Sequence, residues 1–113
     1  MVDDCIFCKI RDGKIPSEKI YSNDYCFVIR DIAPRTPTHV LIIPNEHVTA
    51  LSKLDKQHHE MLCALFESAE KIAKQEGLKN GHRLVFNQGD DAGQQVEHLH
   101  LHLLGGRRLS GMA

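Results

Sequence analysis

The chain has 113 residues, with 14 Lys and Arg against 15 Asp and Glu, so its formal net charge is −1. This length suits a single domain over 1–113, and the balanced charge argues against a protein that coats nucleic acid. No stretch approaches the run of about 18 apolar residues that a membrane-spanning helix needs. The N-terminal segment is acidic, unlike a secretory signal. We therefore expect a cytoplasmic protein that binds neither nucleic acid nor membranes.

The first half of the chain predicts a short helix and three strands. Residues 5–10 resemble one helical turn. Strands at 18–22 and 25–31 are expected to form a hairpin, and two prolines make 33–37 a rigid loop. The β-branched run at 39–44 predicts the third strand.

The second half predicts one long helix and two further strands. The helix is expected over 55–76, with Asp55 as its N-cap and Gly77 ending it. Strands follow at 82–87 and 96–104. Short links between most strands indicate an α+β fold with a five-stranded, mostly antiparallel sheet. The apolar residues of the helix recur every three or four positions and predict one buried stripe: Leu62, Leu65, Phe66, Ala69, Ile72 and Ala73.

The chain contains four cysteines and eight histidines. Without a secretory signal, we expect reduced thiols or a metal site rather than disulfides. Cys26 and Cys63 lie in apolar stretches, and we expect both to be buried. Three histidines outside any pattern are expected to be solvated: His58, His59 and His82.

One segment alternates histidine with leucine. Because side chains of a strand alternate between its faces, His98, His100 and His102 are expected on the open face, about 7 Å apart, with the leucines in the core. As zinc ligands they would form a poor cage, since the outer two lie about 14 Å apart. Separate roles on one anionic substrate fit better, and Gly89 and Gly93 just before them can present N–H groups to phosphate. A polar face that is histidine-rich by chance is the alternative.

The segment His-Leu-His-Leu-His-Leu-Leu-Gly-Gly-Arg resembles the signature of the histidine-triad (HIT) family, and its Gly-Gly-Arg ending resembles the Hint branch rather than the Fhit-like branch. The similarity extends in order through 5–16, 30–34, 37–44 and 87–107, which is nearly the whole chain. The resemblance implies a HIT-like fold and hydrolysis of purine nucleotides.

The resemblance also implies roles for individual residues. His100 corresponds to the nucleophile on the α-phosphorus, His102 to a phosphate contact, and His39 to a histidine that supports proton transfer. Asp31 corresponds to the carboxylate that binds the ribose hydroxyls, and its alternative role is to form a turn. The remaining nucleotide positions lie on the phosphate side (Asn87, Gly93, Gln94 and Gln95) and in the purine slot (Ile6, Phe7, Ile10, Ile29 and Ile32).

Two positions depart from the family pattern. Gln95 replaces a common serine, and Glu97 replaces a common aromatic residue, which puts the substrate preference in question.

A lone Cys-x-x-Cys pair is compatible with a redox motif, with half of a zinc site or with two packed thiols. Some HIT proteins have a Cys₂His₂ arrangement, which implies structural Zn²⁺ at Cys5, Cys8, His47 and His98.

The leading hypothesis is a hydrolase of purine nucleoside phosphoramidates. The alternatives are a dinucleoside polyphosphate hydrolase, a nucleotide-binding adaptor with negligible turnover, and a zinc-stabilised structural protein. We also expect a homodimer, because two sheet edges need protection and the family resemblance implies a two-fold dimer whose sheets join.

Overall fold

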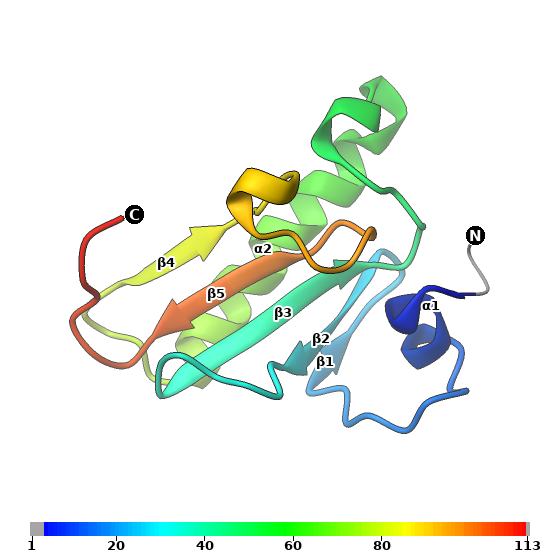
Figure 1. Ribbon diagram of the computed structural model, residues 1–113. Helices are drawn as coiled ribbons and strands as arrows, with labels where there is room; N and C mark the ends of the chain where they lie inside the picture. The colour runs from blue at the N-terminus through cyan, green and yellow to red at the C-terminus, as the bar shows by residue number, and fades with distance from the viewer. Residues whose placement is uncertain (1–3, 113) are drawn as a thin grey trace.

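The computed structural model describes residues 4–112, which form one five-stranded antiparallel sheet between helices (Figure 1). The order across the sheet is β1-β2-β3-β5-β4, so β1 and β4 lie at its edges. The single-domain prediction also includes residues 1–3 and 113, which lie outside the described residues. The strands are β1 (Tyr21–Ser22), β2 (Cys26–Arg30), β3 (Thr38–Pro44), β4 (His82–Val85) and β5 (Leu101–Gly105).

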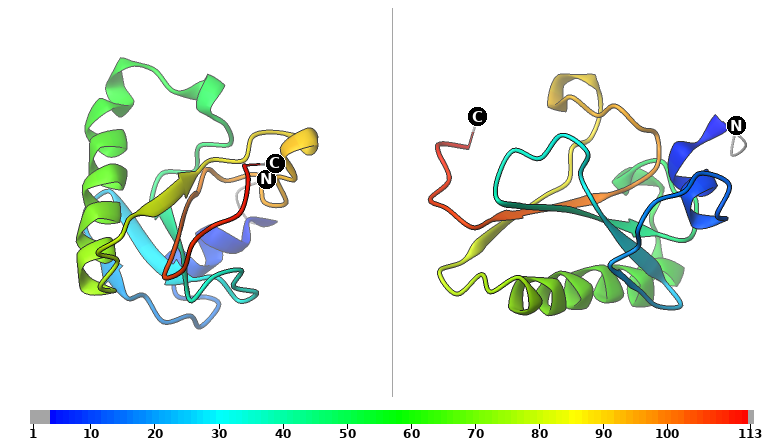
Figure 2. Two further views of the ribbon diagram at one scale, coloured as in Figure 1. Left: turned by 90° about the vertical axis from the view of Figure 1, so that its left-hand side faces the viewer. Right: turned by 90° about the horizontal axis from the view of Figure 1, so that it is seen from below.

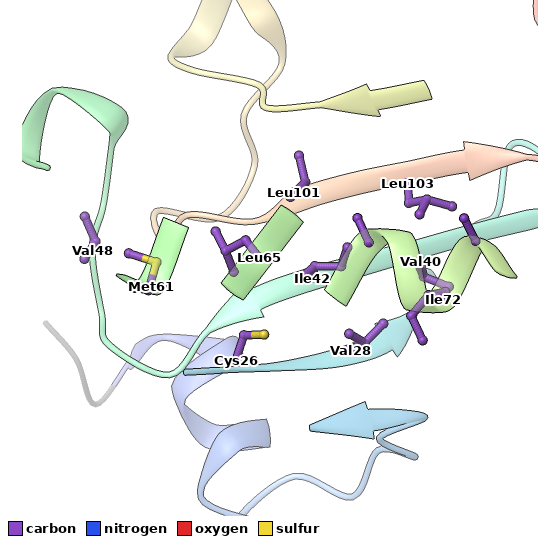
Figure 3. Close-up of a cluster of buried hydrophobic side chains, with 12 residues drawn as sticks. Cys26, Val28, Val40, Ile42, Val48, Met61, Leu65, Ile72, Leu101 and Leu103 are labelled. Carbon is purple, nitrogen blue, oxygen red and sulfur yellow. The ribbon is translucent and has the colours of Figure 1, made fainter. Parts of the chain in front are cut away.

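The long helix α2 (His59–Gln75) covers one face of the sheet, and the short helix α1 (Ile6–Arg11) lies against the other face (Figure 2). On the α2 side, Leu65 and Ile72 pack against side chains from the three central strands (Figure 3). On the α1 side, Phe7 and Ile10 pack with Phe27, Ile29, Leu41 and Ile43. The sheet is therefore buried on both faces near its centre, as the apolar run in β3 requires.

The predicted helical stripe is confirmed at four positions: Leu65, Ala69, Ile72 and Ala73 are buried. Phe66 is 45% exposed, and Cys63 is exposed, so the prediction that Cys63 is buried is wrong. An α-helix turns about 100° per residue, which places Cys63 about 200° from the buried Met61. An apolar sequence neighbourhood does not set the face of a helix. Cys26 is buried, as expected.

The N-cap prediction is confirmed, but the first turn is a 3₁₀ helix (Lys56–His58) that precedes α2. Asp55 accepts a hydrogen bond from the backbone N–H of Gln57. His58 is buried rather than solvated: its Nδ1 accepts from the Asp55 N–H at 3.1 Å, and its Nε2 contacts the Glu46 carboxylate at 2.9 Å. The imidazole thus completes a capping box, a role that glutamate usually takes.

Replacing His58 with alanine is expected to lower the free energy of unfolding by about 1–3 kcal/mol, because it removes two partly buried hydrogen bonds and leaves a cavity where the buried ring lay. Urea unfolding measures this change. The matched control is the exposed neighbour His59, whose change to alanine should cost under about 0.5 kcal/mol. Equal effects of the two changes would contradict the assigned role of His58.

Four strands are shorter than the sequence predicts, and β2, at 26–30 rather than 25–31, differs least. β1 begins at 21, β4 ends at 85, and β5 begins at 101 rather than 96. The N–H of Leu99 donates to the carbonyl of Val48 at 2.6 Å, and Val48 lies beyond the end of β3. The chain over 96–100 is therefore diverted from the sheet ladder before β5 begins. No helix within the described residues has the length and hydropathy needed to cross a membrane.

Candidate active site and metal centre

The diverted segment changes the position of the histidines. His98 is fully buried and His100 is 9% exposed, so the expected row on an open face is wrong. Only His102 lies in β5, where it pairs with Leu41 on β3 and Val85 on β4. The ring centroids of His100 and His102 are 5.1 Å apart, and Phe7 packs against His100 in a T-shaped arrangement. The alternating leucines are buried, as expected.

The orientation of His100 is fixed by one hydrogen bond. Its Nδ1 lies 2.7 Å from the carbonyl oxygen of His98, and a carbonyl can only accept. Nδ1 therefore carries the proton, and Nε2 of the neutral ring keeps its lone pair. A neutral imidazole held in this tautomer is suited to nucleophilic attack.

His39 lies on β3 beside His102, and its tautomer is also fixed. The backbone N–H of Arg35 donates to His39 Nδ1 at 3.1 Å, so Nε2 of the neutral ring carries the proton. That Nε2 lies 3.0 Å from His102 Nδ1, to which it can donate. The proton of His102 then belongs on Nε2. The two rings form a directional hydrogen-bonded pair that starts at a backbone amide.

Burial keeps both rings of this pair neutral near pH 7. Desolvation lowers the pKa of His102 to about 4, and His100 and His39 act in the same direction. Desolvation also lowers the pKa of His39, with the nearby Asp31 carboxylate opposing the change.

These shifts predict a loss of stability in mild acid. The pKa of His102 is about 4 in the folded state, against about 6.5 for an unfolded histidine. The unfolded chain binds the proton first, so stability that is complete above pH 6.5 is lost as the pH falls toward 4. Unfolding by urea at pH 5 should need on the order of 1–2 kcal/mol less than at pH 7. A His102→Gln variant should lose less between the two pH values, and an equal loss would contradict the assignment.

Asp31 combines a turn role with proximity to the histidines. Its Oδ1 accepts from the N–H of Ala33 at 2.9 Å, which is the turn anticipated as its alternative role. Its Oδ2 lies 3.4 Å from His39 Nε2. The carboxylate is partly exposed, so its second oxygen remains accessible beside the histidine pair.

The glycine loop does not offer the expected N–H groups in this conformation. The N–H of Gly93 donates to the carbonyl of Asp90, and that of Gly89 donates to Gln94 Oε1. The Gln94 amide also donates to the carbonyls of Thr49 and Val96. The loop is closed by its own hydrogen bonds, whereas the Gln95 side chain is exposed.

The five apolar residues expected in a purine slot fall into two groups. Phe7, Ile10 and Ile29 are buried in the core beneath α1. Ile6 is 45% exposed, and Ile32 is exposed over its entire side chain. Asn87 is partly buried beyond the end of β4.

Cys5, Cys8, His47 and His98 converge on one point, although the sequence separates them by up to 93 residues. Cys5 Sγ lies 3.3 Å from His98 Nδ1, Cys8 Sγ lies 3.3 Å from His47 Nδ1, and the two Nδ1 atoms are 3.1 Å apart. Tetrahedral zinc, with Zn–S near 2.3 Å and Zn–N near 2.0 Å, sets ligand atoms roughly 3.3–3.8 Å apart. The spacing and the donor set therefore fit Zn²⁺.

Neighbouring groups prepare these ligands. His98 Nε2 lies 2.8 Å from the carbonyl of Pro44, which places the proton there and leaves Nδ1 free. Burial lowers the pKa of His98 to about 4, so the ring is neutral, as a ligand must be. Cys5 caps α1, and its sulfur accepts the N–H of Cys8. Burial raises the pKa of the Cys8 thiol, whereas a bound cation favours its thiolate.

A second cluster, Asp31, His39 and His102, also has ligand atoms close together. It differs from the cysteine cluster in the protonation of one ring. The Arg35 N–H donates to His39 Nδ1, which leaves the proton of His39 on Nε2, the atom that faces the cluster. A protonated nitrogen is not a ligand. The atoms of this cluster are placed to share a proton, whereas the atoms of the cysteine cluster fit a metal ion.

Sequence reasoning missed the groups that orient the rings: the Arg35 N–H and the carbonyls of Pro44 and His98. Backbone groups occur at every residue and carry no compositional signal. The two prolines of 33–37 were the one indication that this loop holds a fixed shape.

The HIT domain pattern matches residues 12–109. The purine nucleoside phosphoramidase of Escherichia coli K12 is 42% identical over 113 residues, which cover 99% of this chain and 95% of that protein. The 14 kDa zinc-binding protein of Zea mays is 45% identical over 107 residues, which cover 93% and 84%. The crystal structure of a HIT family hydrolase from Legionella pneumophila superposes with a TM-score of 0.91 at 42% identity, over 95% of this chain and 96% of that one. These similarities identify a hydrolase, and the chain belongs to the HIT domain family.

Proposed function

We propose that the protein hydrolyses purine nucleoside phosphoramidates of the adenosine 5′-monophosphoramidate type, through a covalent nucleotidyl intermediate on His100. One observation carries this proposal: the His98 carbonyl holds the proton of His100 on Nδ1, so the Nε2 lone pair is free beside His102. The phosphoramidase name of the Escherichia coli relative supports the substrate class.

In the first step the Nε2 lone pair of His100 forms a bond to the α-phosphorus while the phosphorus–nitrogen bond to the amine breaks. In the second step water attacks the same phosphorus and the bond to His100 breaks, which releases the nucleoside monophosphate. The leaving amine takes up a proton in the first step, and the attacking water releases one in the second. Over the two steps these protons balance, so the neutral His102 keeps its Nε2–H on the phosphate oxygen, and His39 supports this arrangement by donating to His102 Nδ1.

Nucleotide binding is assigned to the rest of this face. The free oxygen of Asp31 accepts from the ribose hydroxyls, and exposed Ile6 and Ile32 contact the purine. The Nε2–H of His102 donates to a phosphate oxygen. Gln95 and Asn87 lie on the phosphate side, where Gln95 can donate a hydrogen bond but cannot relay a proton as a hydroxyl can.

The metal centre is proposed to hold a structural Zn²⁺, since four protein ligands close the coordination shell. When bound, the ion supplies a cross-link between the N-terminal helix and the segment that carries the catalytic histidine. The zinc-binding name of the Zea mays relative supports this assignment.

A homodimer is proposed through β4 and α2. Among the described strands, β4 pairs only with β5 and so leaves an open edge. Next to that edge, Phe66 is 45% exposed and packs edge-on against Phe86 with centroids 6.3 Å apart. Light scattering at micromolar concentration should give twice the 12.8 kDa mass of one chain. A single-chain mass would rule out the dimer under those conditions. The cytoplasmic location stays a prediction.

The assay compares turnover of adenosine 5′-monophosphoramidate with that of diadenosine polyphosphates. Preference for the phosphoramidate is expected. Faster cleavage of the polyphosphates would favour the alternative hydrolase, and tight AMP binding without turnover of either substrate would favour an adaptor.

A further inference from the structure

The Gly-Gly-Arg turn that follows β5 packs closely against the proline loop 33–37. Gly106 has φ +98°, and a Cβ added there would lie 2.8 Å from the Cβ of Pro37, so only glycine permits this approach. The next residue, Arg107, donates from Nη2 to the carbonyl of Arg35 at 3.0 Å. The turn therefore holds the loop through one steric contact and one charge-assisted hydrogen bond.

Arg107 bonds to Arg35, and Arg35 is also the residue that orients His39. The carbonyl of Arg35 accepts from Arg107, and its N–H donates to His39 Nδ1 at 3.1 Å. His39 Nε2 in turn lies 3.0 Å from His102 Nδ1. A chain of three hydrogen bonds thus runs from the Arg107 guanidinium to the histidine placed beside His100.

We propose that Arg107 is a positioning residue that acts through the backbone of Arg35 to hold His39 in its Nε2–H tautomer. This inference rests on the proposed function for its effect on turnover. The guanidinium does not touch the histidines, because its hydrogen bonds within the described residues go to the carbonyls of Arg35 and Arg108. Its influence reaches them only through the loop.

The tautomer matters because it determines which atom of His102 faces the substrate. With the proton on His39 Nε2, His102 accepts at Nδ1 and presents Nε2–H to a phosphate oxygen. If His39 carries its proton on Nδ1, His102 must donate from its own Nδ1, and its bare Nε2 then faces the phosphate. A lone pair repels the oxygen charge that grows in the transition state. The charged or titratable groups that face His39 are Asp31, His102 and the Arg35 side chain.

A competing explanation is that Arg107 binds an anionic part of the substrate directly. The two roles differ in kinetics. Loss of a direct contact raises KM, whereas loss of positioning lowers kcat with KM nearly unchanged.

The test combines NMR with kinetics on the full chain. Long-range ¹H–¹⁵N correlation spectra report the tautomer of His39, which a His39→Gln variant assigns. Wild-type protein and the neighbouring control Arg108→Ala should both show the Nε2–H form. Arg107→Ala should show a mixture of tautomers and about a tenfold lower kcat. Arg107→Lys should restore much of both, because lysine can still donate to the Arg35 carbonyl.

A second pair of variants addresses the backbone directly. Arg35→Ala keeps the N–H and should show the wild-type tautomer of His39. Arg35→Pro removes the N–H and should show a mixture of His39 tautomers. An unchanged His39 tautomer in Arg107→Ala overturns the proposal, whatever happens to Arg35→Pro. If the wild-type protein cleaves no phosphoramidate, the proposed function fails, and the spectra still decide whether Arg107 holds the tautomer.

Discussion

Replacing His100 with alanine is expected to lower kcat/KM for a nucleoside phosphoramidate by about three powers of ten or more. The change removes His100 Nε2, the atom that is proposed to form the covalent bond. Phe7 and the His98 carbonyl, which position the ring, remain in the variant. Steady-state kinetics measures the loss. Mass spectrometry of rapidly quenched wild-type enzyme should find AMP attached to His100, and the variant should carry none.

The matched control is His59→Ala. His59 is an exposed histidine on α2, and its loss should leave turnover within about a factor of two because surface changes far from a site rarely alter it. Near-normal turnover in His100→Ala would contradict the covalent mechanism. A loss of activity that accompanies unfolding would show up in the thermal unfolding curve of the same preparation.

The sequence predicted the sheet and its order of elements well where one periodicity dominates. The β-branched run at 39–44 became β3, and the long apolar stripe became α2. It failed at 96–100, where alternation of histidine and leucine is indistinguishable from strand periodicity. The bond from Leu99 N–H to the Val48 carbonyl decides that segment, and it joins residues 51 positions apart. Long-range backbone pairing of this kind leaves no local pattern.

The prediction of the candidate site also succeeded in one part and failed in another. Residue types that carry chemistry were found from the sequence, and the four residues expected to bind zinc do converge. The groups that choose a tautomer were not found, since they are backbone amides and carbonyls. His58 shows the opposite error: its sequence context resembles a solvated helix start, whereas in the fold its buried ring bonds to the Asp55 N–H and the Glu46 carboxylate.

Removal of zinc is expected to lower the thermal midpoint by about 10 °C or more, because the free energy of zinc binding contributes several kcal/mol to the stability of a domain of this size. The ligands join the start of α1, the segment after β3 and the residue that holds His100, so their release loosens three parts of the chain at once. Differential scanning calorimetry before and after chelation measures the change. Freshly purified protein should contain about one zinc per chain.

Two cysteine variants separate the metal from general effects of thiol loss. Cys8→Ser should lose zinc and stability together, since Cys8 contacts both histidine ligands. Cys63→Ser should keep both, because this exposed thiol lies on the far face of α2 from the core. Chelation should lower the thermal midpoint before it changes turnover, when turnover is assayed at temperatures well below unfolding. This order is expected of a closed structural site. Strongly substoichiometric zinc, with the thiols of Cys5 and Cys8 freely titratable in the native protein, would instead identify two packed cysteines.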